Sequence, residues 1–255
     1  MKSVTSVEDS VTSVAAEDAP LVGIVDTGLN ARQMLQAQHS AAFVIEGDHL
    51  WQAAASEDVM GHGSRVCEVI QSLAPGVRIA SAAVFPPPAT PQPGTATHGH
   101  AAPGTTALQV AAAIHWLVDQ GAQIINLSLG LAQDREVLKD ACAAALNKGV
   151  ILCAASPAQG NPVYPAAYPG VIRATGDARC QHQQISFLNT AQADVAGCVR
   201  PMNDAMGASG ASMGCAHISA HIAGFLADNP GADVSRVLHW LNARADWHGR
   251  EFRHA

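Results

Sequence analysis

Short apolar runs that alternate with amphipathic stretches constrain the fold of this 255-residue chain more than any other feature. The apolar runs have the length of buried strands and lie at residues 21–25, 77–84, 123–130 and 150–155. Between them, residues 105–121 and 134–147 carry apolar side chains at helical spacing. Strands that alternate with helices form parallel sheets with right-handed crossovers. We therefore predict an α/β fold.

The length of the chain suits one domain with a sizeable core, and 48% hydrophobic against 14% charged residues suits tight packing. We expect a flexible polar leader at residues 1–20, one folded domain over residues 21–248 and a tail at residues 249–255. Further strands are predicted at residues 43–45, 171–176 and 193–196, and a closing helix at residues 233–243. We predict a surface connection around the strand at 43–45, and loops at the Pro-rich and Gly-rich residues 86–104 and 156–169.

Charge and hydropathy exclude several classes of partner. The formal net charge is −7, and the sequence has no cluster of Lys and Arg that could bind the phosphates of a nucleic acid backbone. We therefore expect no nucleic acid partner. No apolar stretch approaches membrane-spanning length, so we expect no membrane partner and a cytoplasmic location. The six cysteines lie without any Cys-x-x-Cys pair, and reduced thiols suit that compartment. A disulfide between Cys180 and Cys198, which flank a predicted strand pair, is the alternative.

Three polar residues lie where predicted elements begin or end, and each has glycine nearby: Asp26, His62 and Ser212. A serine becomes nucleophilic when a histidine takes its proton, and an acid fixes the tautomer of that histidine. Ser212 lies at the start of a predicted helix, where unpaired N–H groups and the helix dipole favour developing negative charge. The alternatives are a capping serine and a structural or solvated histidine.

Five motifs in the same order resemble those of the subtilisin-like serine proteases, the subtilases of peptidase family S8. They are Val22–Gly28, Gly61–Ser64, Ile124–Gly130, Tyr164–Ile172 and Gly210–Ala220. The similarity covers residues 20–245. It implies a subtilisin-like three-layer fold, with a mainly parallel central sheet and helices on both faces, and makes residues 21–248 a catalytic domain.

The resemblance also implies residue roles. Asp26 would orient His62, His62 would act as general base and then as general acid, and Ser212 would form the acyl-enzyme. The implied substrate-binding residues are Ser128, Leu129 and Gly130, which would pair with an extended peptide backbone. His217 matches a histidine of the serine motif and is expected to be structural.

The sequence departs from the family at the oxyanion loop. Pro157 stands where the family has its oxyanion asparagine, and proline has no N–H to donate. Three explanations remain open: Asn161 replaces the missing donor, the backbone of Ser212 together with Ser156 suffices, or the protein is a weakened or inactive subtilase. Within the serine motif, Gly214 and Ala216 replace the usual alanine and proline.

No cofactor and no metal site are expected. His98 and His100 lie in a loop rich in Pro and Gly, and no Cys, Asp or Glu accompanies them. A solvated loop is the interpretation that we adopt for this segment. No acidic cluster resembles a strong calcium site.

These observations lead to a functional hypothesis. We expect a serine endopeptidase that acts on a peptide or protein substrate. The resemblance includes small subtilases that remove leader peptides from modified precursors, such as those of quinohemoprotein amine dehydrogenase, so the partners include a precursor peptide and its modifying enzyme. The alternative is a non-catalytic subtilase homologue that binds peptides. Asp26-Thr27-Gly28 is also the fingerprint of aspartic proteases, but those are β-rich.

Overall fold

The computed structural model describes residues 18–85, 104–203 and 209–250. The expected loop that contains His98 and His100, and most of the expected leader and tail, lie outside the described residues. None of the described helices is long and apolar enough to cross a membrane.

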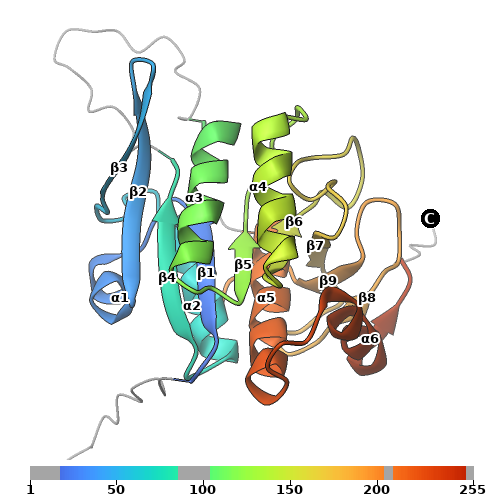
Figure 1. Cartoon of the computed structure of the whole chain (residues 1–255). Coiled ribbons are helices and arrows are strands. Elements are labelled where there is room, and N and C mark those ends of the chain that lie inside the picture. The colour runs from blue at the N-terminus through green and yellow to red at the C-terminus, as the bar shows by residue number, and fades with distance from the viewer. Residues whose placement is uncertain (1–17, 86–103, 204–208, 251–255) are drawn as a thin grey trace, which may run out of the picture.

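The described strands form one ten-stranded sheet in the order β10-β8-β9-β7-β6-β5-β1-β4-β2-β3 (Figure 1). The strands are β1 (Leu21–Asp26), β2 (His39–Glu46), β3 (His49–Ala54), β4 (Arg78–Ala83), β5 (Ile124–Leu127), β6 (Ile151–Ala155), β7 (Ile172–Asp177), β8 (Ser186–Phe187), β9 (Val195–Cys198) and β10 (Trp247–His248). Neighbouring strands are parallel except in the β2–β3 and β8–β9 pairs. The prediction of an α/β fold with a mainly parallel sheet is confirmed.

The chain adds strands on both sides of β1: β4 pairs with one edge of it and β5 with the other. The strand order therefore reverses between β1 and β5. In open α/β sheets, ligands bind outside the carboxyl ends of the strands at such a reversal. Asp26 ends β1 and Ser128 follows β5, so both predicted site residues lie at this place.

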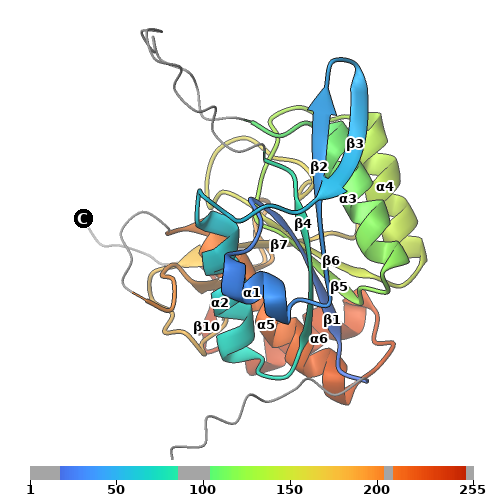
Figure 2. The same ribbon diagram turned by 90° about the vertical axis from the view of Figure 1, so that its left-hand side faces the viewer.

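Helices cover both faces of the sheet (Figures 1 and 2). The described helices are α1 (Ala31–Gln36), α2 (His62–Leu73), α3 (Ala107–Asp119), α4 (Glu136–Asn147), α5 (Ala211–Asp228) and α6 (Val234–Arg244). Helices α3 and α4 pack together on one face, and α2 and α5 pack together on the other. The three layers bury two separate apolar clusters, one on each side of the sheet.

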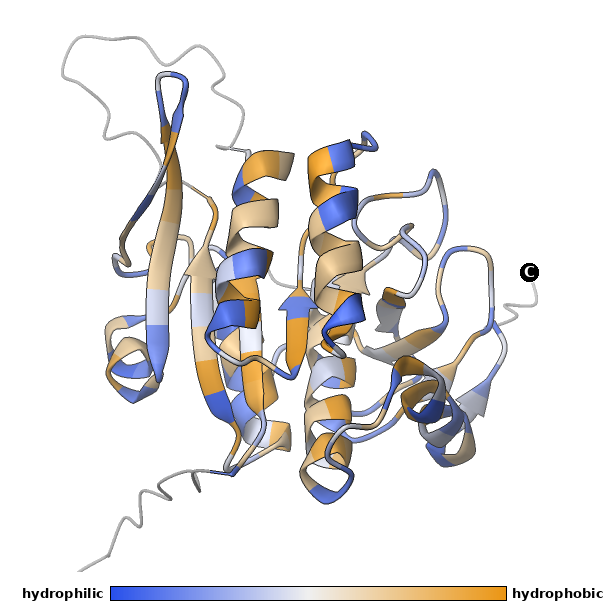
Figure 3. Cartoon of the chain, in the orientation of Figure 1, coloured by the Kyte–Doolittle hydropathy of each residue, from blue (hydrophilic) through white to orange (hydrophobic). Residues whose placement is uncertain are grey.

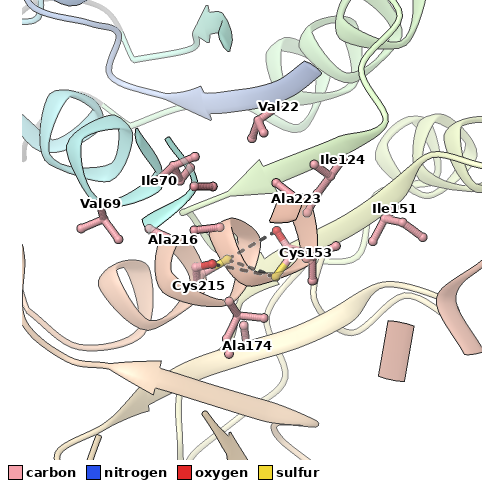
Figure 4. Close-up of a cluster of buried hydrophobic side chains, with 14 of the residues drawn as sticks. Val22, Val69, Ile70, Ile124, Ile151, Cys153, Ala174, Cys215, Ala216 and Ala223 are labelled. Carbon is pink, nitrogen blue, oxygen red and sulfur yellow. Dashed lines mark hydrogen bonds between the residues drawn. The ribbon is translucent and has the colours of Figure 1, made fainter. Parts of the chain in front are cut away.

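Helix α5 is the centre of one of these clusters (Figure 4). It contacts β5, β6, β7 and β9, so it is apolar nearly all round. Cys215 on α5 and Cys153 on β6 meet there with their sulfur atoms 3.7 Å apart. All six cysteines are free thiols, including Cys180 and Cys198, so the alternative of a disulfide between those two is not what the structure contains.

The structure corrects the sequence-based prediction at residues 41–60. Instead of a surface connection around a three-residue strand, the chain forms an antiparallel hairpin of β2 and β3. Nearly every residue of β3 is exposed, so no apolar alternation marks it as a strand. Figure 3 shows that the tip of this hairpin is hydrophilic. Helix α1 was also missed; it is only six residues long, and Asn30 and Gln33 form its capping box.

Candidate active site

Asp26 and His62 form the best-defined contact of the site. The Nδ1 atom of His62 lies 2.7 Å from Oδ1 of Asp26, which is 1% exposed. The N–H of Thr27 donates to the same oxygen at 2.7 Å. Because a carboxylate oxygen can only accept, Nδ1 of His62 carries the proton and Nε2 keeps its lone pair. The structure thus gives His62 the tautomer that a general base needs.

The pKa of His62 reflects opposing effects. Desolvation by burial, the largest single effect, lowers the pKa, whereas the hydrogen bond and the Coulombic attraction to Asp26 raise it. Arg65 lowers it further and Asp58 raises it. The net result is a pKa raised above 6.5, because the carboxylate stabilises the imidazolium more than burial destabilises it.

Asp58 holds the start of α2, where His62 is the first residue. Its carboxylate accepts hydrogen bonds from the backbone N–H groups of Met60, Gly61 and Ser64 and from the Ser64 hydroxyl. Gly61 has φ 72°, in the left-handed region that favours glycine, and makes the sharp entry into the helix. Helix α2 therefore presents His62 in a fixed orientation without help from substrate.

Two glycines permit the close approaches on which the site depends. A Cβ added to Gly63 would lie 2.3 Å from the carbonyl oxygen of Gly28, and one added to Gly214 would lie 2.0 Å from that of Thr175. The first contact brings α2 against the end of β1. The second seats the first turn of α5 directly on the backbone of β7. Gly214, a departure from the family pattern, is thus required by this packing.

Ser212 lies in the first turn of α5. The N-cap Gly210 provides no side-chain hydrogen bond, so the first N–H groups of the helix remain available to negative charge. The Ser212 hydroxyl donates to the carbonyl of Ser128 at 3.2 Å, and the Ser128 hydroxyl donates to the carbonyl of Ser212 at 3.2 Å. No hydrogen bond among the described residues joins Ser212 to His62.

Asn126 connects this serine pair to the core. Its side-chain amide donates to the Ser128 hydroxyl at 2.9 Å, and its carbonyl oxygen accepts from Ser219 at 2.9 Å and from Cys215 at 3.2 Å. All of these side chains except Ser128 are fully buried, and Ser128 is 5% exposed. The network fixes α5 to β5 in register.

The two candidate oxyanion donors differ in the structure. Ser156 donates its hydroxyl to the Gln192 carbonyl at 2.6 Å and its N–H to the Ala174 carbonyl at 2.8 Å, so both of its donors are engaged elsewhere. Asn161 is exposed in the loop after β6. That loop returns to the substrate-side segment through an antiparallel bridge between Tyr164 and Leu131.

A cavity of about 500 Å³ opens beside the entry to α5. Gln159, Thr175 and Val199 help to line it. The carbonyl of Val199 accepts a hydrogen bond from the N–H of Gly210, two residues before Ser212. The cavity therefore lies against the candidate oxyanion loop and against the segment that leads into α5.

His217, expected to be structural, is fully buried on α5. Its Nδ1 donates to the carbonyl of Met213 at 2.8 Å, and burial lowers its pKa to about 4.

Three residues that support the site were not predicted from the sequence: Asp58, Thr27 and Asn126. Asn126 had a signal, because it is a polar residue inside an otherwise apolar strand; Asp58 had none.

A buried acid, a histidine with a free Nε2 and a helix-initiating serine define a hydrolase of the serine-nucleophile class. The chain belongs to the subtilase family of serine proteases: the Peptidase S8 subtilase family model matches residues 17–251. Subtilisin DY of Bacillus licheniformis is 26% identical over 254 residues, which cover 91% of this chain and 85% of that protein. The minor extracellular protease Epr of Bacillus subtilis (strain 168) is 41% identical over 80 residues, which cover 30% of this chain and 12% of Epr.

Solved structures show the same fold. A cold-adapted subtilisin-like serine proteinase superposes with a TM-score of 0.60 at 21% identity, covering 90% of this chain and 85% of that one. A lanthipeptide protease superposes with a TM-score of 0.62 at 14% identity, covering 86% of this chain and 78% of that one. The predicted subtilisin-like fold is thereby confirmed.

Proposed function

We propose that this subtilase hydrolyses peptide bonds through Asp26, His62 and Ser212, and that its task is the removal of a leader from a precursor peptide. The observation that carries the catalytic part is the 2.7 Å contact between Asp26 and His62 Nδ1, at the sheet edge to which α5 brings Ser212. The contact leaves His62 Nε2 as the proton acceptor.

The reaction begins when the Ser212 hydroxyl turns from the Ser128 carbonyl to His62 Nε2. His62 takes the proton as Ser212 Oγ attacks the scissile carbonyl carbon, and the imidazolium then protonates the leaving amine. Water deprotonated by His62 cleaves the acyl-enzyme and restores the Ser212 hydroxyl. The oxyanion accepts hydrogen bonds from the backbone N–H of Ser212 and from the side-chain amide of Asn161.

The substrate backbone pairs with Ser128, Leu129 and Gly130, which extend beyond β5. The cavity beside Gly210 accepts a substrate side chain. Asp177 and Arg250 line it together with polar and apolar residues such as Gln159 and Leu188, so it offers contacts of all three kinds to that side chain.

The processing role draws support from two observations. Structural neighbours include the lanthipeptide protease and the protease domain of PatA, and both share the fold with this chain. Six free thiols, all buried, suit the reducing cytoplasm in which we place the enzyme, with a precursor peptide and its modifying enzyme as partners. The relative Epr differs in this respect, because its name describes it as an extracellular protease.

A fluorophosphonate probe tests the nucleophile without any knowledge of the substrate. We expect mass spectrometry to locate one adduct on Ser212 of the purified protein. Ser212→Ala should abolish labelling, whereas Ser209→Ala, a change at the exposed serine three residues earlier, should leave it intact. Labelling that persists in folded Ser212→Ala contradicts the assignment.

Cleavage of a proteome-derived peptide library tests the processing role separately. A leader-removing enzyme should cut few peptides at closely related sites, whereas degradation of most peptides would leave the serine protease in place and refute the processing role.

The second candidate function is a peptide-binding homologue without catalysis. It is favoured by Pro157 at the oxyanion position and by the bond from the Ser212 hydroxyl to Ser128 instead of to His62. A folded protein that binds library peptides but takes no fluorophosphonate adduct would establish this function.

A further inference from the structure

Three side chains of metal-ligand type meet beside the N-terminal half of α5. His182 lies in the turn between β7 and β8, Cys198 ends β9, and His217 lies on α5. Their ligand atoms all lie within 4.8 Å of one another, and no other group of three His, Cys, Asp or Glu residues in the described part of the chain does this. Spacings of 16 and 19 residues gave no signal of this cluster in the sequence.

The orientation of His217 suits a ligand. Because its Nδ1 donates to the Met213 carbonyl at 2.8 Å, its Nε2 carries a lone pair. In metal-binding histidines, one ring nitrogen binds the metal, and the N–H of the other donates to a carbonyl or carboxylate that orients the ring. Nε2 faces Nδ1 of His182 at 3.0 Å. Gly197 leaves room for the ring, since a Cβ added there would lie 2.6 Å from the Cβ of His217.

The distances come near to those of a tetrahedral zinc site. Zn–N bonds of about 2.0–2.1 Å and Zn–S bonds of about 2.3 Å place two nitrogens about 3.3 Å apart and nitrogen and sulfur about 3.6 Å apart. The two ring nitrogens, now 3.0 Å apart and joined by a hydrogen bond, need to separate by a few tenths of an ångström, and the rings need to turn so that both nitrogens point to the metal. The Cys198 sulfur, which lies within 4.8 Å of both nitrogens, needs to approach by about 1.2 Å at most.

We propose that His182, Cys198 and His217 form a Zn²⁺ site whose fourth position is taken by water. Two imidazoles and a thiolate are ligands that select zinc over calcium or magnesium. On binding, Cys198 loses its thiol proton to solvent. His182, which now donates from Nδ1 to His217, moves that proton to its own Nε2 and binds zinc through Nδ1. One proton is released for each zinc bound.

Zinc at this site would join the β7–β8 turn, the end of β9 and α5 through side chains. The Met213 carbonyl that orients His217 belongs to the residue after Ser212, so the same hydrogen bond connects the site to the nucleophile's turn. None of the three ligands is a member of the proposed triad. The role of the metal is therefore to brace the helix that carries Ser212.

Zinc and cobalt titrations of the reduced full-length protein test the proposal. After chelator treatment, we expect one equivalent of Zn²⁺ to bind in competition with a chromophoric chelator, with about one proton released and a rise in Tm. Co²⁺ should give a thiolate-to-cobalt charge-transfer band. Cys198→Ser and His182→Ala should each weaken binding by at least about 100-fold.

The controls locate the site. Cys142→Ser, at a buried cysteine on α4, and His239→Ala, at an exposed histidine on α6, should bind zinc as the wild type does. His62→Ala should also retain binding, and so should a variant with alanine at both His98 and His100. His182 is only half-buried, so His182→Ala serves if Cys198→Ser fails to fold. Lack of one-to-one binding in the wild type, a cobalt complex without the thiolate band, or unchanged binding in folded His182→Ala would overturn the proposal.

Discussion

The two halves of the candidate active site are built in different ways. On one side, Asp26 and His62 are joined at 2.7 Å, and the start of α2 is fixed by four hydrogen bonds to Asp58. On the other side, the hydroxyl of Ser212 is bonded to a backbone carbonyl, and the loop with Asn161 is exposed. The proposed proton acceptor His62 is thus preorganised before substrate arrives, whereas the proposed nucleophile Ser212 still has one hydrogen bond to exchange.

Asp26→Asn should have the largest effect, because it acts on the preorganised half. An asparagine that donates its amide to His62 Nδ1 would favour the wrong tautomer, and kcat should fall by about 10⁴-fold. The rate of fluorophosphonate labelling would follow this loss without a known substrate. Asp119→Asn, on the exposed face of α3, is the matched control and should label normally. A loss of less than tenfold would show that Asp26 does not set the tautomer.

The pH dependence of labelling sharpens the same point. The protonated ring of His62 cannot accept a proton, so labelling should fall as the pH decreases through the raised pKa, with a midpoint above 6.5. In Asp26→Asn, desolvation still lowers the pKa but the attraction of the carboxylate is gone. The midpoint of the residual activity should therefore move below 6.5. An unchanged midpoint would mean that another group controls the acid limb.

Asn161→Ala tests the less ordered half. In subtilisin itself, a relative of this chain, removal of one oxyanion donor costs about 10²–10³ in kcat. We expect a loss of that size here if the exposed Asn161 amide turns to the oxyanion. Ser156→Ala is the matched control and should change kcat little, because both Ser156 donors already bind carbonyl groups. Equal and small effects of both changes would leave only backbone donors at the oxyanion.

The sequence predicted the central strands because they are mostly apolar: β1 and β6 lie within one residue of the expected bounds, whereas β5 ends three residues before the expected end. It also singled out Asp26 and His62, which the structure brings together. It could not predict β3, whose side chains are exposed and show no pattern.

Nor could the sequence predict contacts between distant segments. The carboxylate of Asp58 caps α2 from a loop, and His182 reaches His217 across two elements of the fold. Such contacts depend on loop conformation, which the spacing of apolar residues along the sequence does not predict. Ser156 illustrates the same limit: its position suggested an oxyanion donor, and only the structure shows that its hydroxyl is already bonded to Gln192.

Gly214→Ala should have an intermediate effect, through stability. The added methyl group would lie 2.0 Å from the Thr175 carbonyl oxygen, so α5 would have to move away from β7. Overpacking of this kind costs about 1–3 kcal/mol of unfolding free energy, measurable as a lower urea midpoint. Gly224→Ala on the same helix is the matched control. Nothing lies within 4 Å of its added Cβ, so alanine there should stabilise the protein by up to about 1 kcal/mol.

Ser64→Ala should have the smallest effect, and it tests how redundant the preorganised half is. The change removes one hydrogen bond to Asp58 at 2.7 Å but leaves the three backbone N–H groups that the same carboxylate accepts. We expect a cost of about 1 kcal/mol in unfolding free energy and a labelling rate within about threefold of the wild type. Asp58→Ala removes all four bonds at once and should reduce both quantities much further. If Ser64→Ala alone slowed labelling as strongly as Asp58→Ala, the orientation of His62 would depend on the hydroxyl and not on the carboxylate. The acid–base half would then be as easily disturbed as the nucleophile half.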